Sequence, residues 1–363
     1  MLTLLHKVGN FVISYTPTKV FSMFNTRFFA LILSLILSST VVAQLRSINS
    51  IVGESSISEE DENKIKKYAI GWAQQLLSTD AELLSRAHTK LSNPLDRDVR
   101  ITSYARSIYG KYLKEGFQPL LDLNSENEMA AVNALQILSL LGTEQACGVL
   151  LDHADVKTEN RPAMRLWASI GLGTSFLTGE LPVDRIERYA KLLANFSGIE
   201  EQWFVLSRQF DSLASLQAVP NLDRSQQDTL EATSFELQTK SLIKLLDSII
   251  NSQGVDNRVQ ALPFIFPSLL LQIIEPSVNP VTKSETLDAL LPSLIAFVEY
   301  AVTRDSTDDT SFLHNSYGGA AHSAGLLITR AIGSHGDDQI MSLWNNGDYE
   351  DILELVEIWK ASQ

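Results

Sequence analysis

Apolar residues recur along most of this chain at the spacing of one-sided α-helices. They fall at positions i, i+3, i+4 and i+7, which places them on one stripe of a helix. Examples are Ile65, Tyr68, Ala69, Trp72 and Leu76 near the start, Trp203, Leu206, Phe210 and Leu213 in the middle, and Ile352, Leu355, Val356 and Trp359 at the end. Strand-type alternation over six or more residues is hard to find. The periodicity predicts an all-α fold, with residues 59–363 forming a single helical domain.

Local signals predict where some of these helices start and stop. Ser58 precedes a run of acidic residues and is a suitable N-cap. Asn346-Gly347 lies between two helical patterns and indicates a turn between helices. Three prolines fall inside apolar helical runs, where proline should kink or interrupt a helix: Pro263, Pro267 and Pro292.

The first 43 residues have the pattern of an export signal. No acidic residue precedes Glu54, and Arg27 is followed by the apolar stretch 28–37 and by a small-residue exit that ends at Ala43. This stretch is shorter than the roughly 20 residues that span a bilayer. We expect cleavage after Ala43 and a periplasmic or extracellular protein, which meets a membrane only during export.

The length of this leader raises a question about the start of translation. Met23 would give a signal peptide of ordinary length, residues 23–43, and residues 1–22 would then be an upstream extension outside the mature protein. The alternative is a genuine extended start at Met1. A Ser-rich linker, residues 44–58, joins the signal to the helical domain.

One stretch in the first half of the chain has the pattern of a helical repeat. Residues 130–141 form an Ala/Leu-rich helical pattern, Gly142 suits a left-handed helix end, Thr143 suits the next N-cap, and a second helical pattern ends at Leu150-Leu151. This stretch resembles a HEAT repeat. A second copy begins 34 residues later at Met164-Arg165, and a fainter one 31 residues earlier at Val99-Arg100.

The resemblance covers about residues 95–200 and is to armadillo-type α-solenoids. It implies a HEAT-like α-α superhelix of antiparallel helix pairs, irregular toward the C-terminus, where the helices expected at 228–252 and 284–303 are longer. The alternative is a helical bundle without repeats.

The charge balance bears on the partners of the chain. It holds 43 acidic and 29 basic residues, a net charge of −14, with a pI of about 4.9. Residues 1–43 carry three basic and no acidic residues, so their removal takes the net charge from −14 to −17. Such a surface repels phosphate backbones, and no dense run of Lys and Arg offsets it. We therefore expect no nucleic-acid partner.

The candidates for chemistry are weak. None of the histidines is followed by Glu, so the His-Glu-x-x-His zinc motif is absent. A C-terminal group has spacings that fit no closed metal site: His314, His322, His335, Asp308, Asp309, Asp337 and Asp338. Residues 321–325 resemble a hydrolase nucleophile elbow around Ser323 but lack the preceding strand. We assign no catalytic, cofactor-binding or metal-binding residue and expect no cofactor.

The lone cysteine, Cys147, lies in an apolar helical pattern and is expected to be a buried, inert thiol. Asn195-Phe196-Ser197 has the glycosylation pattern, which matters only in a secretory eukaryote.

The leading functional hypothesis is an exported protein-binding or scaffold module, because helical arrays present long surfaces to other proteins. The alternative is an exported enzyme of a helical class, an α/α-barrel lyase or hydrolase that acts on a polymer. A cleft with converging titratable groups would favour the enzyme, and a smooth groove would favour the binding protein. The sequence sets no oligomeric state.

Overall fold

The computed structural model of the protein describes residues 45–96, 98–122, 127–252, 254–305, 313–333 and 339–362. The chain divides into two compact units, residues 1–45 and residues 46–363. All elements given below belong to the second unit. The proposed extension 1–22 and signal peptide 23–43 lie outside the described residues.

The described residues form helices and no strand, which confirms the all-α prediction. The α-helices are α2 (Asn49–Val52), α3 (Glu59–Gln75), α4 (Ala81–Ser92), α5 (Ser103–Leu121), α6 (Glu128–Ser139), α7 (Glu144–Ala154), α8 (Pro162–Phe176), α9 (Val183–Ser197), α10 (Trp203–Ala214), α11 (Arg224–Ile250), α12 (Leu262–Ile274), α13 (Pro280–Asp305), α14 (His314–Ile332), α15 (Ile340–Asn346) and α16 (Tyr349–Ala361). Three short 3-10 helices are η1 (Asn93–Leu95), η2 (Ser215–Ala218) and η3 (Asn257–Ala261).

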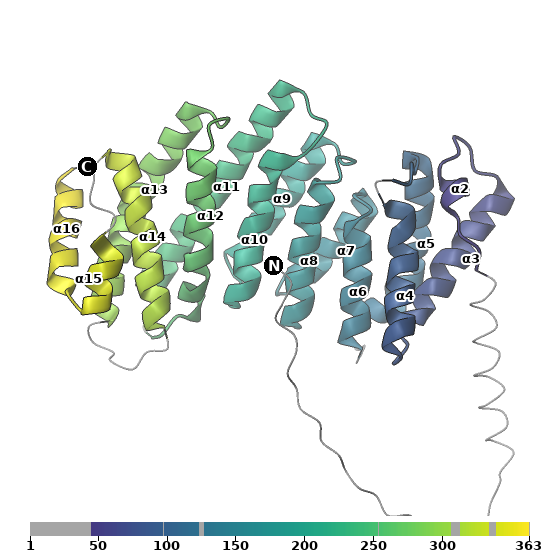
Figure 1. The fold of residues 1–363 in the computed structure, drawn as a ribbon, viewed down its shortest axis with the longest axis horizontal. Coiled ribbons are helices and arrows are strands. Elements are labelled where there is room, and N and C mark those ends of the chain that lie inside the picture. Colours follow the sequence, from purple (N-terminus) through teal and green to yellow (C-terminus); the bar gives the residue numbers. More distant parts are fainter. Residues whose placement is uncertain are drawn as a thin grey trace, which may run out of the picture. The chain divides into compact units, whose positions relative to one another are not determined.

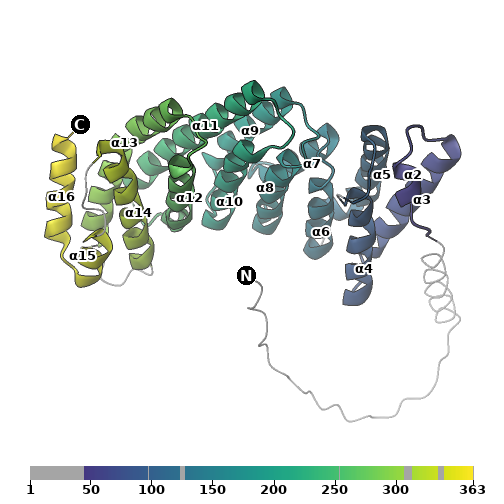
Figure 2. The same ribbon diagram turned by 45° about the horizontal axis from the view of Figure 1, so that its top comes forward.

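Within the unit 46–363 the helices pack in two layers (Figures 1 and 2). The first layer contains α4, α6, α8, α10, α12 and α14, and each of these helices contacts the next one in the layer. The second layer contains α3, α5, α7, α9, α11, α13 and α16, with the same succession of contacts. Most helices also pack against a chain neighbour in the other layer. The main contacts therefore join elements that are close in the sequence.

Left-handed residues mark three successive turns from the first layer to the second. Gly142 has φ +58° between α6 and α7, Gly179 has φ +73° between α8 and α9, and Asn221 has φ +63° between η2 and α11. The turns pack against one another. A Cβ added to Gly142 would lie 2.0 Å from Thr178 Oγ1, and one added to Gly179 would lie 3.0 Å from Pro220 Cγ. The left-handed conformation predicted for Gly142 is confirmed.

The helix boundaries follow several of the predicted local signals. The Ser58 hydroxyl accepts a hydrogen bond from the Asp61 N–H, and the Thr143 hydroxyl accepts one from the Ala146 N–H. Both residues are the N-caps that the sequence predicts. Gly347 ends α15 with φ +78°, directly before α16.

The prolines behave differently from one another. Pro263 lies in the first turn of α12, where the chain passes from η3 into that helix. Pro267 and Pro292 lie inside α12 and α13, which continue through them. The predicted interruption is found at Pro263, whereas Pro267 and Pro292 do not interrupt their helices.

Of the two further repeat copies, one agrees with the layers of the structure and the other does not. Met164-Arg165 lies in the first turns of α8, in the same layer as α6, as a repeat requires. Val99-Arg100 instead precedes α5, a helix of the other layer, so the fainter copy is out of phase with the other two.

The segment 44–58, expected to be a linker, is part of the folded unit. It contains α2, in which Val52 is fully buried, and the Val52 carbonyl accepts the Thr102 N–H at 2.9 Å.

Among the described helices, α13 alone has the length and apolar composition that would allow it to span a membrane. Its apolar window is 56% buried. Its partners are α11, α14 and α16, so it is a core helix of the second unit.

Candidate functional site

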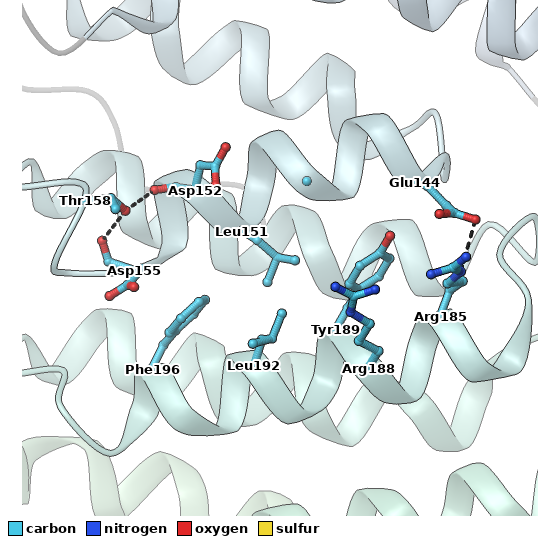
Figure 3. Close-up of a pocket in the computed structure, with 11 residues that line it drawn as sticks. Glu144, Leu151, Asp152, Asp155, Thr158, Arg185, Arg188, Tyr189, Leu192 and Phe196 are labelled. Atoms are coloured by element: carbon cyan, nitrogen blue, oxygen red, sulfur yellow. Dashed lines mark hydrogen bonds and ion pairs between the residues drawn. The ribbon is translucent and has the colours of Figure 1, made fainter.

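A groove runs between α7 and α9, two neighbours in the second layer (Figure 3). It encloses about 350 Å³. We call it the α7–α9 groove, and its lining residues are Glu144, Gly148, Leu151, Asp152, Asp155, Thr158, Arg185, Arg188, Tyr189, Leu192 and Phe196.

The middle of the groove is apolar. Leu151 points from α7 toward α9, while Leu192 and Phe196 point from α9 toward α7 (Figure 3). The amphipathic pattern of α9 explains this, because Ile186, Ala190 and Leu193 face the core and leave the flanking positions for the groove. Leu192 and Phe196 are only half-buried, so apolar surface remains open to a ligand.

One end of the groove carries basic side chains. Arg185 pairs with Glu144 at 3.2 Å and with Asp184 at 3.7 Å, which ties the first turn of α9 to the first turn of α7. Arg188 lies one turn further along α9, is exposed, and forms no ion pair with a described residue. Its guanidinium is therefore available to an acidic group.

The other end of the groove is acidic. Asp152 and Asp155 lie in and just after the last turn of α7, and neither pairs with a basic side chain in the described part of the chain. The Asp155 carboxylate accepts the Lys157 N–H at 2.9 Å, which fixes the turn that follows α7. The groove thus has the unpaired Arg188 toward the N-terminal ends of its two helices, an apolar middle, and acidic side chains at the C-terminal ends.

Gly148 lines the groove from inside α7 and contributes no side chain to it. A glycine inside a helix costs about 1 kcal/mol of stability relative to alanine, so its presence usually has a packing reason. Such a reason exists in α8: Cβ atoms added to Gly171 and Gly173 would lie 2.8 Å from Leu150 and Ser212. A Cβ added to Gly148 would meet nothing within 4 Å. Close packing therefore does not account for this glycine.

Two groups at the groove, Tyr189 and Cys147, have raised pKa values. Burial raises the pKa of Tyr189, with smaller contributions from Cys147 and Glu144. Cys147 is buried behind the lining residues, and its burial raises the pKa of the thiol to about 12. The burial that the sequence predicts for this cysteine is confirmed. The lining residues include Tyr189 and the carboxylates of Asp152 and Asp155, but no histidine or serine.

The histidines of the described residues do not gather at one site. His88 lies on α4, where burial lowers its pKa, while His153 lies on α7 and His322 on α14. No group of three or more His, Cys, Asp or Glu side chains among the described residues could hold a metal ion. Five members of the expected C-terminal group lie outside the described residues: Asp308, Asp309, His335, Asp337 and Asp338.

His314 has a structural setting. Its Nδ1 lies 2.7 Å from Asp305 Oδ2, which also accepts the Tyr349 hydroxyl. The ring packs beside Trp344, with 5.8 Å between the ring centroids. This contact joins α13, α14 and α16 at the C-terminal end of the second unit.

Ser323 lies within α14 and is buried. Its hydroxyl donates to the Gly319 carbonyl, one turn earlier, at 2.9 Å. A nucleophile elbow needs a strand-to-helix turn, and this serine is in mid-helix.

Buried ion pairs lie at the loops that lead from a helix of the second layer to the next helix of the first layer. Glu159, between α7 and α8, is bound by Arg161 and by His153 Nδ1 at 2.8 Å. Burial pulls the pKa of Glu159 upward, but these hydrogen bonds outweigh it and lower the pKa below its usual value. Arg165 on α8 binds Glu200, between α9 and α10, through two hydrogen bonds of 2.7 and 2.9 Å.

Comparison with known proteins gives no relative: no family model, no curated protein and no solved structure matches this chain.

Proposed function

We propose that this chain is an exported protein-binding module, and that the α7–α9 groove receives a segment of its partner. The observation that carries the proposal is Gly148, because helix stability favours alanine there and packing does not require glycine. A bound segment gives a physical reason for the missing side chain: it needs the space over α7.

We further propose that the second unit is a HEAT-like superhelix of helix pairs. The two-layer succession of contacts supports this arrangement, as do the stacked left-handed turns at Gly142, Gly179 and Asn221. The two matching stretches that open at residues 130 and 164 fall on α6 and α8, equivalent helices of the first layer.

The charges of the groove indicate the chemistry of the partner. A complementary segment has an acidic side chain beside Arg188, apolar side chains over Leu192 and Phe196, and a basic side chain beside Asp152. The net charge of −14 adds a long-range preference for a partner that is basic overall. Burying about three side chains in such a groove gives modest affinity, typical of transient peptide recognition.

Selection from a random peptide library tests the groove. We expect the purified protein to enrich peptides that carry an acidic and a basic residue on either side of an apolar pair. Gly148→Trp should abolish this enrichment by filling the groove, since its Cβ is free of steric conflict. Arg188→Glu should shift the acidic position of the enriched peptides to a basic one.

Gly148→Ala is the matched control. It should weaken the enrichment less than Gly148→Trp does, because its methyl group takes up only part of the space over α7, and it should raise the free energy of unfolding by about 0.5–1 kcal/mol. The proposal is wrong if no pattern is enriched, or if the folded Gly148→Trp protein selects the same peptides as the parent.

Export has its own test. We expect N-terminal sequencing of protein recovered outside the cytoplasm to begin at Gln44, because the small residues before it suit signal cleavage. Recovery of the uncleaved chain in the cytosol alone would contradict export without affecting the groove.

A further inference from the structure

Tyr189 takes part in both the core and the α7–α9 groove. It lies on the buried side of α9 with Ile186 and Leu193, and the residue as a whole is only 7% exposed. It also lines the groove, and Figure 3 shows its hydroxyl pointing from α9 toward α7. The ring therefore serves the packing of α9, while the hydroxyl adds a polar group to the groove.

The Tyr189 hydroxyl forms no hydrogen bond with any described residue. A buried tyrosine usually finds a partner for this group. Three others donate to a carbonyl or a carboxylate at 2.6, 2.8 and 2.6 Å, respectively: Tyr68, Tyr109 and Tyr112. The hydroxyls of Tyr300 and Tyr317 also lack a partner, but their oxygens are sealed inside the fold. Tyr189 thus combines burial, an unpaired hydroxyl and an opening to the groove.

Arg188 brings a positive charge to the same place. It is exposed and forms no ion pair with a described residue. Burial raises the pKa of Tyr189, and the charge of Arg188 opposes this rise, so the guanidinium lies within electrostatic reach of the hydroxyl. The phenol stays protonated at neutral pH and can donate a hydrogen bond. The groove therefore holds two donors close together, one neutral and one charged, that the fold leaves unused.

The charge balance favours a carboxylate as their common acceptor. Arg185 is already paired with Glu144, so Arg188 is the one unpaired cation among the lining residues. A carboxylate carries one negative charge and has two oxygens, one for each donor. A phosphate carries nearly two charges at neutral pH, and the excess charge would face Glu144. A neutral carbonyl could accept from the phenol but would leave the guanidinium without a counterion.

The depth of the hydroxyl indicates where the carboxylate comes from. Since Tyr189 is nine-tenths buried, its hydroxyl lies at the base of the groove rather than at its rim. A carboxylate on a side chain stands away from the backbone and can reach this depth while the segment lies across the groove. The carboxylate at the end of a chain is attached to the backbone itself. An Asp or Glu side chain is therefore the better match.

We propose that Tyr189 and Arg188 together bind one Asp or Glu side chain of the partner, and that Tyr189 is a specificity-determining residue of the groove. This inference rests on the proposed function of the groove. It names the chemical group that the groove selects at this end, and a second residue that reads it.

Peptide selection with the parent and with Tyr189→Phe tests the inference. A synthetic random library with acetylated and amidated ends leaves side chains as the only carboxylates. We expect the variant to keep the apolar pair and the basic residue of the selected peptides. It should bind the parent's best acidic peptide about 10- to 100-fold more weakly, as expected for the loss of a hydrogen bond to a charged group. The same peptide with Asn or Gln at the acidic position should lose much less.

Two comparisons separate this role from a structural one. Because the hydroxyl bonds to nothing within the fold, Tyr189→Phe should unfold at the same urea concentration as the parent. Tyr104→Phe removes a phenol that is 57% exposed on α5, outside the groove, and should bind like the parent. If both donors hold one carboxylate, the effects of Tyr189→Phe and Arg188→Gln on affinity should not multiply in the double variant.

Four results would overturn the inference. If the parent enriches a pattern and Tyr189→Phe selects acidic residues just as strongly, Tyr189 is not a specificity determinant, although the groove still binds peptides. If the parent enriches no pattern, the function of the groove and this inference fail together. Binding that requires a free C-terminus would assign the carboxylate to a chain end. Tighter binding of a phosphoserine peptide than of its Asp counterpart would assign the two donors to a phosphate.

Discussion

Replacing Glu200 with alanine should lower the free energy of unfolding by about 3–5 kcal/mol, the usual cost of removing one partner from a buried ion pair. The side chains of Arg165 and Glu200 are only 4% and 1% exposed, so the arginine would keep a buried charge without its counterion. Glu200 also accepts the N–H groups of Glu201 and Gln202, which would lose their acceptor. Urea unfolding followed by circular dichroism measures the change.

Asp211→Ala is the control for this prediction. Asp211 pairs with Arg208 at 2.6 Å, but both side chains are exposed, so its loss should cost at most about 1 kcal/mol. A double variant, Arg165→Met with Glu200→Leu, removes both charges and should recover most of the stability that Glu200→Ala loses. Equal unfolding midpoints for Glu200→Ala and Asp211→Ala would show that the buried pair does not stabilise the fold.

Leu150→Ala should cost about 2–5 kcal/mol, because it opens a cavity between α7 and α8. Leu150 is fully buried, and its Cδ2 lies 2.8 Å from the position of a Cβ added to Gly171. Leu77→Ala, at a position that is 48% exposed, is the matched control and should change stability far less. Both are measured by the same urea titration.

A double variant makes this prediction specific to the contact. Gly171→Ala alone should destabilise the protein, because the new methyl group collides with Leu150. In the Leu150→Ala background the methyl group enters the cavity instead, so the double variant should be more stable than Leu150→Ala alone. If the two effects simply add, the side chains are not in contact and the packing between α7 and α8 described above is wrong.

The local features of the fold were predictable from the sequence. Apolar periodicity reports which side of a helix faces the core, and it was sufficient for the all-α class. Ser58 and Thr143 were identified because a cap interacts with backbone groups only a few residues away. Gly142 was identified for the same reason, since a helix end needs a left-handed residue within the next one or two positions.

Features that depend on stacking of distant segments were not predictable. Arg165 and Glu200 are 35 residues apart, and only the packing of α8 beside the connection that follows α9 brings them together. The repeat copy predicted at Val99-Arg100 was assigned to the wrong layer, because a Val-Arg pair can precede or begin a helix in either layer. Gly148 was visible as a glycine in a helical pattern, but a single sequence does not distinguish a glycine that packs tightly from one that leaves space.

Each helix of the second unit contacts mainly its neighbours, so a local change such as ligand binding should alter the stability of nearby helices only. Stability in such an arrangement is approximately a sum of local terms, each shared by adjacent helices. A ligand between α7 and α9 would slow amide exchange in those helices and in their neighbours α8 and α11, and its effect would fade toward α14. Occupation of the α7–α9 groove would therefore leave the helices at the C-terminal end of the unit, α14 and α16, unchanged.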